Sequence, residues 1–567
     1  MIVSKHKLIL DQNIVRRISN IIKNTPAMST FAGKKLFQNS LKLPSLPVPS
    51  LNQTIEKYVK TVTPFLTESE LLNTKKLLKE FSDEGGTGKK LQKLLVERAH
   101  QHENWLDEWW LHTAYLEYRD PVVVFSSPGL VFPFEEFSNE SDRLKYTARL
   151  ILAAVQYYLN IWSEKLPLDK MGKDPLDMNQ YKKIFGTCRI PQLKRDALEF
   201  NPESKHIIIA RNNNFFRLDI LNKNGELPSE NELIDELSII ITKSEDPGPS
   251  IGVLTSENRD TWSQAYAELI KGEDGTVGLT YEHSPSEGQP IAVMTDFLID
   301  YIKNNGSKDL HDTKIETEPR KLEFNISDSL QKYIQQANVN IDKLADNLDL
   351  DAFQFTSFGK EFVKSQKMSP DSYIQIAMQY AFYRIHQTPG AHYESAATRK
   401  YIHGRTETIR SCSIESIAFA KAMLDNNKSI NEKVAALKEA IASHKKYSLE
   451  AVNGFGVDRH LLGLKLIALE NNIELPAVYK DKAYILSSRM RISTSQVATK
   501  CDGFMCYGPL TPDGYGCCYN PRPYDINFAV SAFVEHPDTT AKKFRESLEA
   551  SLKDMHDILV FTQKAKL

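Results

Sequence analysis

The sequence predicts a mixed α/β protein with two or more domains. Its 567 residues are more than the roughly 250 to 300 at which a single hydrophobic core stops growing. Short runs rich in Ile, Val, Phe and Tyr alternate with longer stretches whose apolar residues recur at helical spacing. Such alternation is typical of sheets flanked by helices.

Charge and cysteine usage exclude several functional classes. The formal net charge is -2, from 71 basic and 73 acidic residues, so we expect no nucleic-acid partner. The cysteines show no paired C-x-x-C spacing, which indicates a reducing compartment and argues against structural zinc. The longest apolar stretch, 150–162, is bounded by Arg149 and Glu164 and predicts a core helix, not a membrane span.

Both ends of the chain carry features of targeting signals. Residues 1–42 are basic, with Asp11 as their one acid, and resemble a mitochondrial transit peptide. A basic docking tail is the alternative. The chain closes with Ala-Lys-Leu at 565–567, a conservative variant of the peroxisomal S-K-L signal. We therefore expect a mitochondrial protein with the peroxisome as a second destination.

Local patterns place the first elements. Residues 67–81 predict a helix, because Thr67 is a good N-cap before acidic and then periodic apolar residues. The stretch 85–90, "GGTGKK", predicts a turn between helices, since it lacks the spacing of a phosphate-binding loop. Three tryptophans at helical spacing are interpreted as core anchors: Trp105, Trp109 and Trp110.

The remaining elements follow from periodicity. We expect strands at 206–210, 215–221, 250–256, 276–282, 484–494, 502–510, 514–521 and 525–533. We expect helices at 230–241, over most of 327–402, and at 413–443, 458–472 and 539–563.

One histidine stands where a predicted strand ends, in "GLTYEHSPSEGQPIA". His283 is followed by Glu287, but Pro285 between them argues against the helix that a metal-binding pair would need. A histidine beside a carboxylate is suited to general-base catalysis. It is equally compatible with an ordinary polar residue at a strand end.

Two further clusters carry chemistry. Lys360, Lys364 and Lys367 would line one face of a helix, either as a phosphate site or as a solvated surface. The hydroxyls of 493–495 follow a predicted strand and could be turn residues or stabilise an oxyanion.

A third cluster lies at 393–410. Arg399, Arg405 and Arg410 alternate there with small residues. They could hold a ligand carboxylate, or they could form ion pairs with Glu394 and Glu407.

Many separate motifs occur in order along the chain. They are "LPVPSL", "ENWLDEWW", "YRDPVVVFSSPG", "MNQY", "GVLTSENRDTW", "YEHSPSEG", "FGKEF", "SPDSYIQ", "YESA", "GRTETIRS", "DRHLLGLK", "STSQ" and "GYGCCYNP". Together they resemble the carnitine/choline acyltransferase family, and most closely its members that acetylate carnitine. The resemblance covers nearly the whole chain after about Leu43.

The resemblance implies a fold. The family has two similar α/β domains with mixed β-sheets flanked by helices, like chloramphenicol acetyltransferase, and an active-site tunnel at the domain interface. On this sequence, 43–90 and 326–567 would form the domain that binds carnitine and CoA. Residues 91–325 would form the domain that carries the catalytic histidine.

The resemblance also implies a reaction, the reversible transfer of an acetyl or other short acyl group between acetyl-CoA and L-carnitine. His283 would be the general base, with Glu287 as its motif partner, and transfer would be direct, without an acyl-enzyme. Ser495 would stabilise the oxyanion and contact carnitine. No metal or permanently bound cofactor is implied, since CoA is a co-substrate. We expect a monomer, and peripheral membrane association is compatible with the family.

The family's binding residues carry over to positions outside the catalytic motif. Carnitine would contact Tyr393, Thr406 and Arg459 through its carboxylate, and Tyr507 through a cation–π contact with its trimethylammonium group. CoA would contact Lys360, Lys364 and Asp371. Met505 would block the acyl pocket and favour short acyl groups; the alternative is a core-filling methionine.

One departure from the family stands out. Relatives carry several dozen more residues before the "EDGTVGLTYEH" segment, where this chain has only 270–272. We expect this loss to expose a sheet edge and apolar core. It leaves open a shortened, non-catalytic form that binds CoA or carnitine. A choline or medium-chain acyltransferase is the other alternative, which Arg459 and Met505 argue against.

Overall fold

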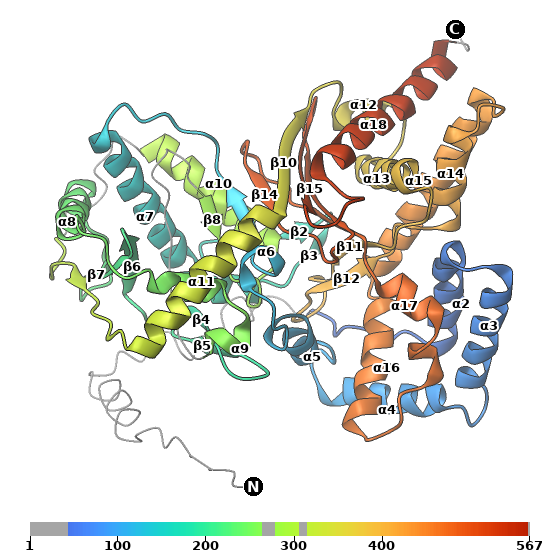
Figure 1. Ribbon diagram of the computed structural model, residues 1–567, viewed down its shortest axis with the longest axis horizontal. Helices are drawn as coiled ribbons and strands as arrows, with labels where there is room; N and C mark the ends of the chain where they lie inside the picture. Colours follow the sequence, from blue (N-terminus) through green and yellow to red (C-terminus); the bar gives the residue numbers. More distant parts are fainter. Residues whose placement is uncertain (1–42, 264–277, 306–313, 565–567) are drawn as a thin grey trace.

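The computed structural model describes residues 43–263, 278–305 and 314–564. Its architecture is mixed α/β, as the sequence predicts, with two sheet-containing regions side by side (Figure 1). The basic leader, the 270–272 bridge and the C-terminal tripeptide lie outside the described residues. Their targeting roles stay predictions.

One region contains a six-stranded sheet, in the order β10-β16-β15-β13-β11-β12. Its strands are β10 (Leu348–Phe355), β11 (His392–Ala397), β12 (Thr406–Ile409), β13 (Ile492–Gln496), β15 (Tyr515–Pro521) and β16 (Ile526–Phe533). The sheet is mixed, because β13 pairs parallel with β11 and β15 while the other neighbours are antiparallel. We call this sheet and the helices packed on it the six-stranded region.

Four helices pack together beside this sheet (Figure 1). They are α13 (Pro370–His386), α14 (Ile414–Leu424), α15 (Ile430–Val452) and α18 (Ala541–Lys564), and the short α12 (Lys360–Ser365) precedes them. Nearly every residue of α13 from Ser372 to Phe382 is buried, because the helix lies between the sheet and the other helices.

The first helices of the chain pack against two late ones (Figure 1). These are α2 (Leu51–Val62), α3 (Glu68–Ser82) and α4 (Thr87–Gln101), with α16 (Asp458–Glu470) and α17 (Lys482–Ser488). Thr67 and Glu70 form the predicted capping box at the start of α3. The "GGTGKK" stretch begins as the predicted turn between α3 and α4, and Trp105 and Trp109 are in this core.

The other region contains two separate three-stranded antiparallel sheets, β14-β1-β8 and β6-β7-β9. The strands are β1 (Gly129–Val131), β6 (His206–Arg211), β7 (Asn214–Asp219), β8 (Gly278–Thr280), β9 (Arg320–Lys321) and β14 (Phe504–Cys506), beside the small hairpins β2–β3 (170–175) and β4–β5 (187–200). Its main helices are α7 (Glu140–Trp162), α8 (Glu230–Lys243), α10 (Gly288–Asn305) and α11 (Asp328–Asn347). We call it the split-sheet region.

An open space distinguishes the split-sheet region. In the part of the chain that the structure describes, the outer edges of β6 and β8 have no strand beside them. A cavity of about 620 Å³ lies among α7, α8, α11 and the β6–β7 hairpin, lined by apolar side chains such as Leu144, Ile209 and Phe215. Protein cores are close-packed, so these side chains have fewer van der Waals partners than those of a filled core. These features are what the loss of a family segment would leave, but the residues at the bridge lie outside the described chain, so that loss stays a prediction.

Three predicted elements differ from the structure. Residues 250–256 form a 3₁₀ turn, η4 (Ile251–Ser256), not a strand. Residues 484–488 belong to α17, and the strand begins only at Ile492. The predicted helical stretch 327–402 contains two strands, β10 and β11. Short apolar runs fit helix and strand equally well, so tertiary contacts decided all three.

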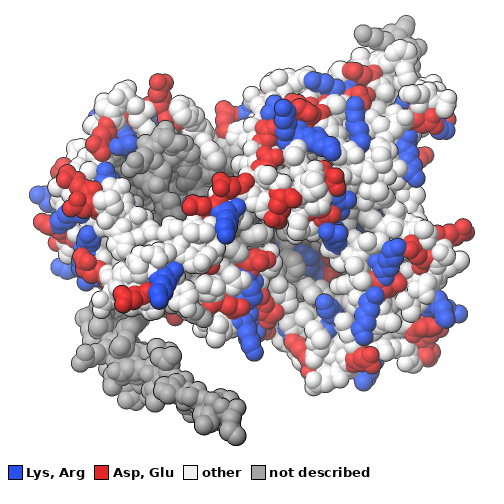
Figure 2. Space-filling view, viewed as in Figure 1, with Lys and Arg blue, Asp and Glu red and all other residues white. Residues whose placement is uncertain are grey.

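The surface charge distribution and the hydrophobicity of the helices agree with the composition. Basic and acidic side chains intermingle over the face shown in Figure 2. The apolar stretch 150–162 is part of α7, and none of the described helices is long and apolar enough to cross a membrane.

Candidate active site

His283 lies in the turn between β8 and α10, at the junction of the two regions. The proline two residues later prevents a helix here, as predicted. The imidazole Nε2 lies 3.7 Å from the Glu287 carboxylate Oε2, and both side chains are mostly buried. The histidine and its motif carboxylate therefore face each other without a helix.

Glu287 is held by a residue of the other region. Arg405, immediately before β12, donates from Nε to Glu287 Oε1 at 2.6 Å. The Arg405 guanidinium also donates to the backbone carbonyls of Ser284 and His283, at 2.6 and 3.1 Å. Burial alone would raise the pKa of Glu287, but the positive charge of Arg405 and its hydrogen bond hold this pKa below its usual value. Glu287 is thus an ionised carboxylate beside the histidine.

The arginine cluster at 393–410 does not form the ion pairs that the sequence allowed with Glu394 and Glu407. Arg405 pairs with Glu287, Arg410 with Asp458 and Arg399 with Asp169. All three connect the cluster to residues more than 40 positions away, so spacing along the chain could not identify their partners.

Arg459, near the start of α16, has a different environment. Its guanidinium donates to Thr406 O at 3.0 Å, Thr408 Oγ1 at 3.1 Å and Thr406 Oγ1 at 3.3 Å. It also stacks 3.6 Å from the ring centroid of Trp110. Arg459 is only 6% exposed, yet the ion pairs of the described residues do not include it. The Glu407 carboxylate accepts only the backbone N–H of Arg459, at 3.3 Å, so the guanidinium itself is hydrogen-bonded by neutral groups and can bind an anion.

The sheet register places the other predicted carnitine residues nearby. Tyr393 of β11 lies opposite Ser493 of β13, two residues before Ser495. Burial raises the pKa of the Tyr393 phenol, and a hydrogen bond with the Thr406 side chain opposes this effect. The Tyr507 hydroxyl donates to the Ser493 carbonyl at 3.0 Å. These residues and Arg459 therefore line one side of the junction.

The predicted CoA residues cluster at a second opening. Lys360 and Asp371 line a cavity of about 440 Å³ together with Gln496, Lys500 and Arg522. Lys364, half-exposed on α12, forms an ion pair with Glu361 at 2.8 Å. Helix α12 ends at Ser365 and Lys367 has a positive φ of 59°, so the three lysines do not share one helix face.

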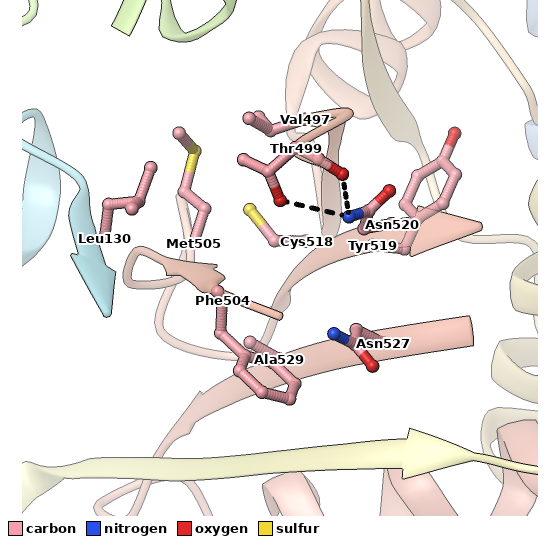
Figure 3. Close-up of a pocket in the computed structure, with 11 residues that line it drawn as sticks. Leu130, Val497, Thr499, Phe504, Met505, Cys518, Tyr519, Asn520, Asn527 and Ala529 are labelled. Atoms are coloured by element: carbon pink, nitrogen blue, oxygen red, sulfur yellow. Dashed lines mark hydrogen bonds between the residues drawn. The ribbon is translucent and has the colours of Figure 1, made fainter. Parts of the chain in front are cut away.

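Met505 stands in a filled part of the interior. It lies opposite Leu130 in the β1–β14 pairing, and Figure 3 shows it between Leu130 and Cys518. The space that these side chains and Val497 enclose is about 10 Å³, about one water molecule. An extended acyl chain cannot enter here without displacing Met505.

One trio of potential metal ligands lies near the CoA residues. Ligand atoms of Asp371, Glu394 and His444 lie within 4.8 Å of one another. Glu394 accepts hydrogen bonds from Ser411 and His444, both at 2.8 Å, and Asp371 accepts one from Tyr519 at 2.5 Å. Hydrogen bonding within the protein therefore accounts for the cluster.

Three residues at the junction were not found by sequence reasoning. Trp110 packs against the core, as predicted, and it also stacks on the Arg459 guanidinium, which was not predicted. Tyr115 contacts His283 Nδ1, and Gln180 accepts the backbone N–H of Glu287 at 2.8 Å. All lie more than 100 positions from their partners, and no local pattern marks them.

Comparison with known proteins identifies the family. The sequence model of choline/carnitine O-acyltransferases matches residues 46–273 and 268–550. Carnitine O-acetyltransferase of Columba livia is 38% identical over 93% of this chain and 94% of its own length. The chain belongs to the choline/carnitine O-acyltransferase family. It is therefore an acyltransferase of mixed α/β fold.

Family membership does not distinguish the two acceptor classes. The human carnitine O-acetyltransferase is 37% identical over 93% of this chain and 95% of its own length. Choline O-acetyltransferase of Danio rerio is 35% identical over 91% of this chain and 93% of its own length. The choice between the two acceptors must come from the site.

The family match is interrupted where the sequence predicts a missing segment. The two matched pieces meet at 268–273. The alignment with the Columba livia enzyme is 594 residues long although it covers only 93% of the 567-residue chain. Its relatives thus carry residues that this chain lacks.

Solved structures give weaker similarities. A trichothecene 15-O-acetyltransferase from Fusarium sporotrichioides has a TM-score of 0.38 at 10% identity, covering 76% of this chain and 90% of its own. The condensation enzyme VibH has a TM-score of 0.35 at 9% identity, covering 81% and 96%.

Proposed function

We propose that this protein reversibly transfers an acetyl or other short acyl group between CoA and L-carnitine. The observation that carries the proposal is the Arg459 guanidinium, which is buried and held by Thr406, Thr408 and Trp110. Carnitine brings a carboxylate that would pair with it, and choline has none. Because a buried unpaired charge is costly, a site built for choline would not keep this arginine.

His283 is the proposed general base. It accepts the proton of the carnitine hydroxyl while that oxygen attacks the thioester carbonyl carbon of acetyl-CoA. The tetrahedral intermediate then collapses, the carbon–sulfur bond breaks, and the CoA sulfur takes the proton back from His283. Removing the proton during attack contributes typically 10²- to 10⁴-fold, because an alcohol is otherwise a poor nucleophile.

Neighbouring groups stabilise the charges that develop. The ionised Glu287 lies 3.7 Å from His283 Nε2 and would stabilise the imidazolium. Arg405 holds that carboxylate and the backbone of the catalytic turn together. Ser495 on β13 would donate to the oxyanion. Tyr507, on the same side of the junction, would face the trimethylammonium group.

The CoA end is proposed at the cavity beside α12 and α13. Lys360 and Lys364 provide positive charge for its phosphates, and Asp371 lies on the cavity wall. The acyl pocket is a separate question from the CoA cavity. The filled space around Met505 supports a short acyl group.

The acyl preference is tested by comparing the rates of transfer from acetyl-CoA and from octanoyl-CoA. Comparable rates would refute a blocked acyl pocket.

The acceptor is tested by replacing the anion-binding arginine. Arg459→Gln should lower kcat/KM for carnitine by about 30-fold or more, since losing one partner of a buried charge pair costs roughly 2–5 kcal/mol. Choline serves as the internal control, because its rate does not depend on pairing a carboxylate. An equal loss with both acceptors, or a wild-type preference for choline, would exclude carnitine recognition by Arg459.

The shortened sequence motivates one competing function, a protein that binds CoA or carnitine without turnover. Calorimetry with each ligand and measurement of CoA release from acetyl-CoA plus carnitine separate the two. Binding by protein that unfolds cooperatively, without CoA release, would select the non-catalytic form.

A further inference from the structure

Tyr115 touches the proposed base from the side opposite Glu287. It belongs to η2 (His112–Leu116), a π-helical turn, and its hydroxyl lies 3.2 Å from His283 Nδ1. The two rings are stacked, with centroids 5.2 Å apart and planes at 30°. Among the described residues, Tyr115 is the hydrogen-bond partner of the His283 side chain. Glu287 Oε2 lies 3.7 Å from Nε2, which is too far for a hydrogen bond.

The position of Tyr115 is tightly determined. Arg189 donates to the Tyr115 carbonyl at 2.8 Å and to the buried Asp196 at 2.7 Å. The backbone N–H of Asp196 in turn donates to the carbonyl of Leu116, also in η2, at 2.9 Å. The Arg405 guanidinium lies 5.1 Å from the Tyr115 ring centroid. π-Helical turns occur often at functional sites, and this one is anchored by a buried ion-pair cluster.

Catalysis and the neighbouring Glu287 favour different tautomers of His283. A base that acts through Nε2 needs its lone pair there, so the single proton of the neutral ring must be on Nδ1. The negative charge of Glu287 beside Nε2 favours the other tautomer, which would be unable to accept the substrate proton. A hydrogen-bond acceptor at Nδ1 therefore decides whether the base is competent.

We propose that Tyr115 is a positioning residue for His283, whose hydroxyl oxygen accepts the Nδ1–H and so selects the tautomer with a free Nε2. The inference rests on His283 being the base of the proposed function. After proton transfer, both imidazolium N–H groups have partners, Tyr115 Oη at one end and Glu287 at the other. Burial raises the pKa of Tyr115 above its ordinary value, so the hydroxyl stays neutral.

The chain offers a matched control. Tyr281 is also buried, and its ring centroid lies 5.5 Å from that of His283. In the described structure the Tyr281 hydroxyl has no hydrogen-bond partner. Tyr115→Phe and Tyr281→Phe each remove one hydroxyl oxygen next to His283. Only Tyr115→Phe also removes a hydrogen bond to the imidazole.

The test compares Tyr115→Phe with Tyr281→Phe in full pH profiles. Tyr115→Phe should lower kcat roughly 10- to 100-fold, the effect of one hydrogen bond to a charged group, and change KM for carnitine less than about threefold. The acid limb of kcat/KM should move to lower pH, because the imidazolium loses a partner. Tyr281→Phe should stay within about twofold of wild type. Equal profiles for the two variants would overturn the inference.

A second measurement does not need turnover. Diethyl pyrocarbonate acylates neutral imidazole, and mass spectrometry of the peptide that contains His283 follows the reaction. The pH dependence of this labelling should shift to lower pH in Tyr115→Phe and not in Tyr281→Phe. Absence of wild-type turnover would reject the proposed function. An unshifted labelling profile would reject the role of Tyr115 by itself.

Discussion

The six-stranded region and the split-sheet region contribute differently to the same site. The first has a continuous mixed sheet covered by buried helices, and it supplies Arg459, Thr406, Tyr393 and Ser495. The second has two short sheets with unpaired edges among the described strands and a cavity of about 620 Å³, and it supplies His283. The proposed binding groups thus lie on the well-packed region and the proposed base on the loosely packed one.

This difference shows how the chain can keep a complete site while lacking residues that its relatives have. The turn with His283 is held less by its own sheet than by Arg405 of the six-stranded region, which binds Glu287 and two backbone carbonyls. Asp196 and its arginines support the same turn through Glu282, to which Arg189 donates at 3.2 Å. Contacts outside the split sheets therefore position the base.

The largest expected effect separates chemistry from binding. His283→Ala should lower kcat by about 10²- to 10⁴-fold, because the general base is lost. Its Kd for carnitine, measured by calorimetry, should stay within a few-fold of wild type, since the binding groups belong to the other region. His206→Ala on β6 is the control for removing a histidine from the split-sheet region. Loss of carnitine binding in His283→Ala would contradict this division.

The second-largest expected effect is a difference in local backbone opening between the two regions. Strands β7 and β15 are both central in their sheets, so pairing alone would protect them equally. We expect amide hydrogens of β7 to exchange about 100-fold faster, because local opening is easier where fewer apolar contacts are lost. Hydrogen–deuterium exchange with mass spectrometry measures this ratio. Equal protection would show that the cavity does not weaken the region.

Packing can be tested with one substitution in each region. Ala210 lines the cavity, whereas Ala532 is fully buried in the core of the six-stranded sheet. Ala532→Leu should lower the free energy of unfolding by about 1–3 kcal/mol through overpacking. Ala210→Leu should raise it by about 0.5–1 kcal/mol by filling space. Denaturant unfolding measures both, and equal destabilisation would mean that the cavity is already filled.

The smallest effect concerns pH and the six-stranded region. Burial raises the pKa of Glu407 from its ordinary value to about 7, against the opposing effect of Arg459. The folded state then binds a proton more tightly than the unfolded state, so this group stabilises below about pH 4.5 and the contribution is lost as pH rises to 7. Between these values the melting temperature of wild type should fall by about 1–3 °C relative to Glu407→Gln, because the unfolding entropy of a large chain makes such shifts small. If the melting temperatures of wild type and Glu407→Gln changed in parallel between pH 4.5 and 7, the raised pKa of Glu407 would be contradicted.

Local elements were predictable because their causes are local. The capping residues of α3, the short buried runs of β15 and β16 and the long apolar periodicity of α15 and α18 are properties of neighbouring residues. The strand predicted at 250–256 is wrong, and the one predicted at 484–494 is right only from Ile492, since short apolar runs do not distinguish strand from helix. Strand β10 was missed although Leu348–Phe355 alternates apolar and polar residues in its first half, which is a strand pattern.

The residue types of the site and the place of each motif in the chain follow from the amino-acid sequence. Their partners depend on how the chain folds: Arg405 binds Glu287 across 118 positions, Tyr115 contacts His283 across 168, and Trp110 stacks on Arg459. Periodicity and capping act over a few residues, whereas these contacts depend on how two regions pack. The same packing leaves the guanidinium of Arg459 buried and without a carboxylate among the described residues, and this is the feature that selects carnitine as the proposed acceptor.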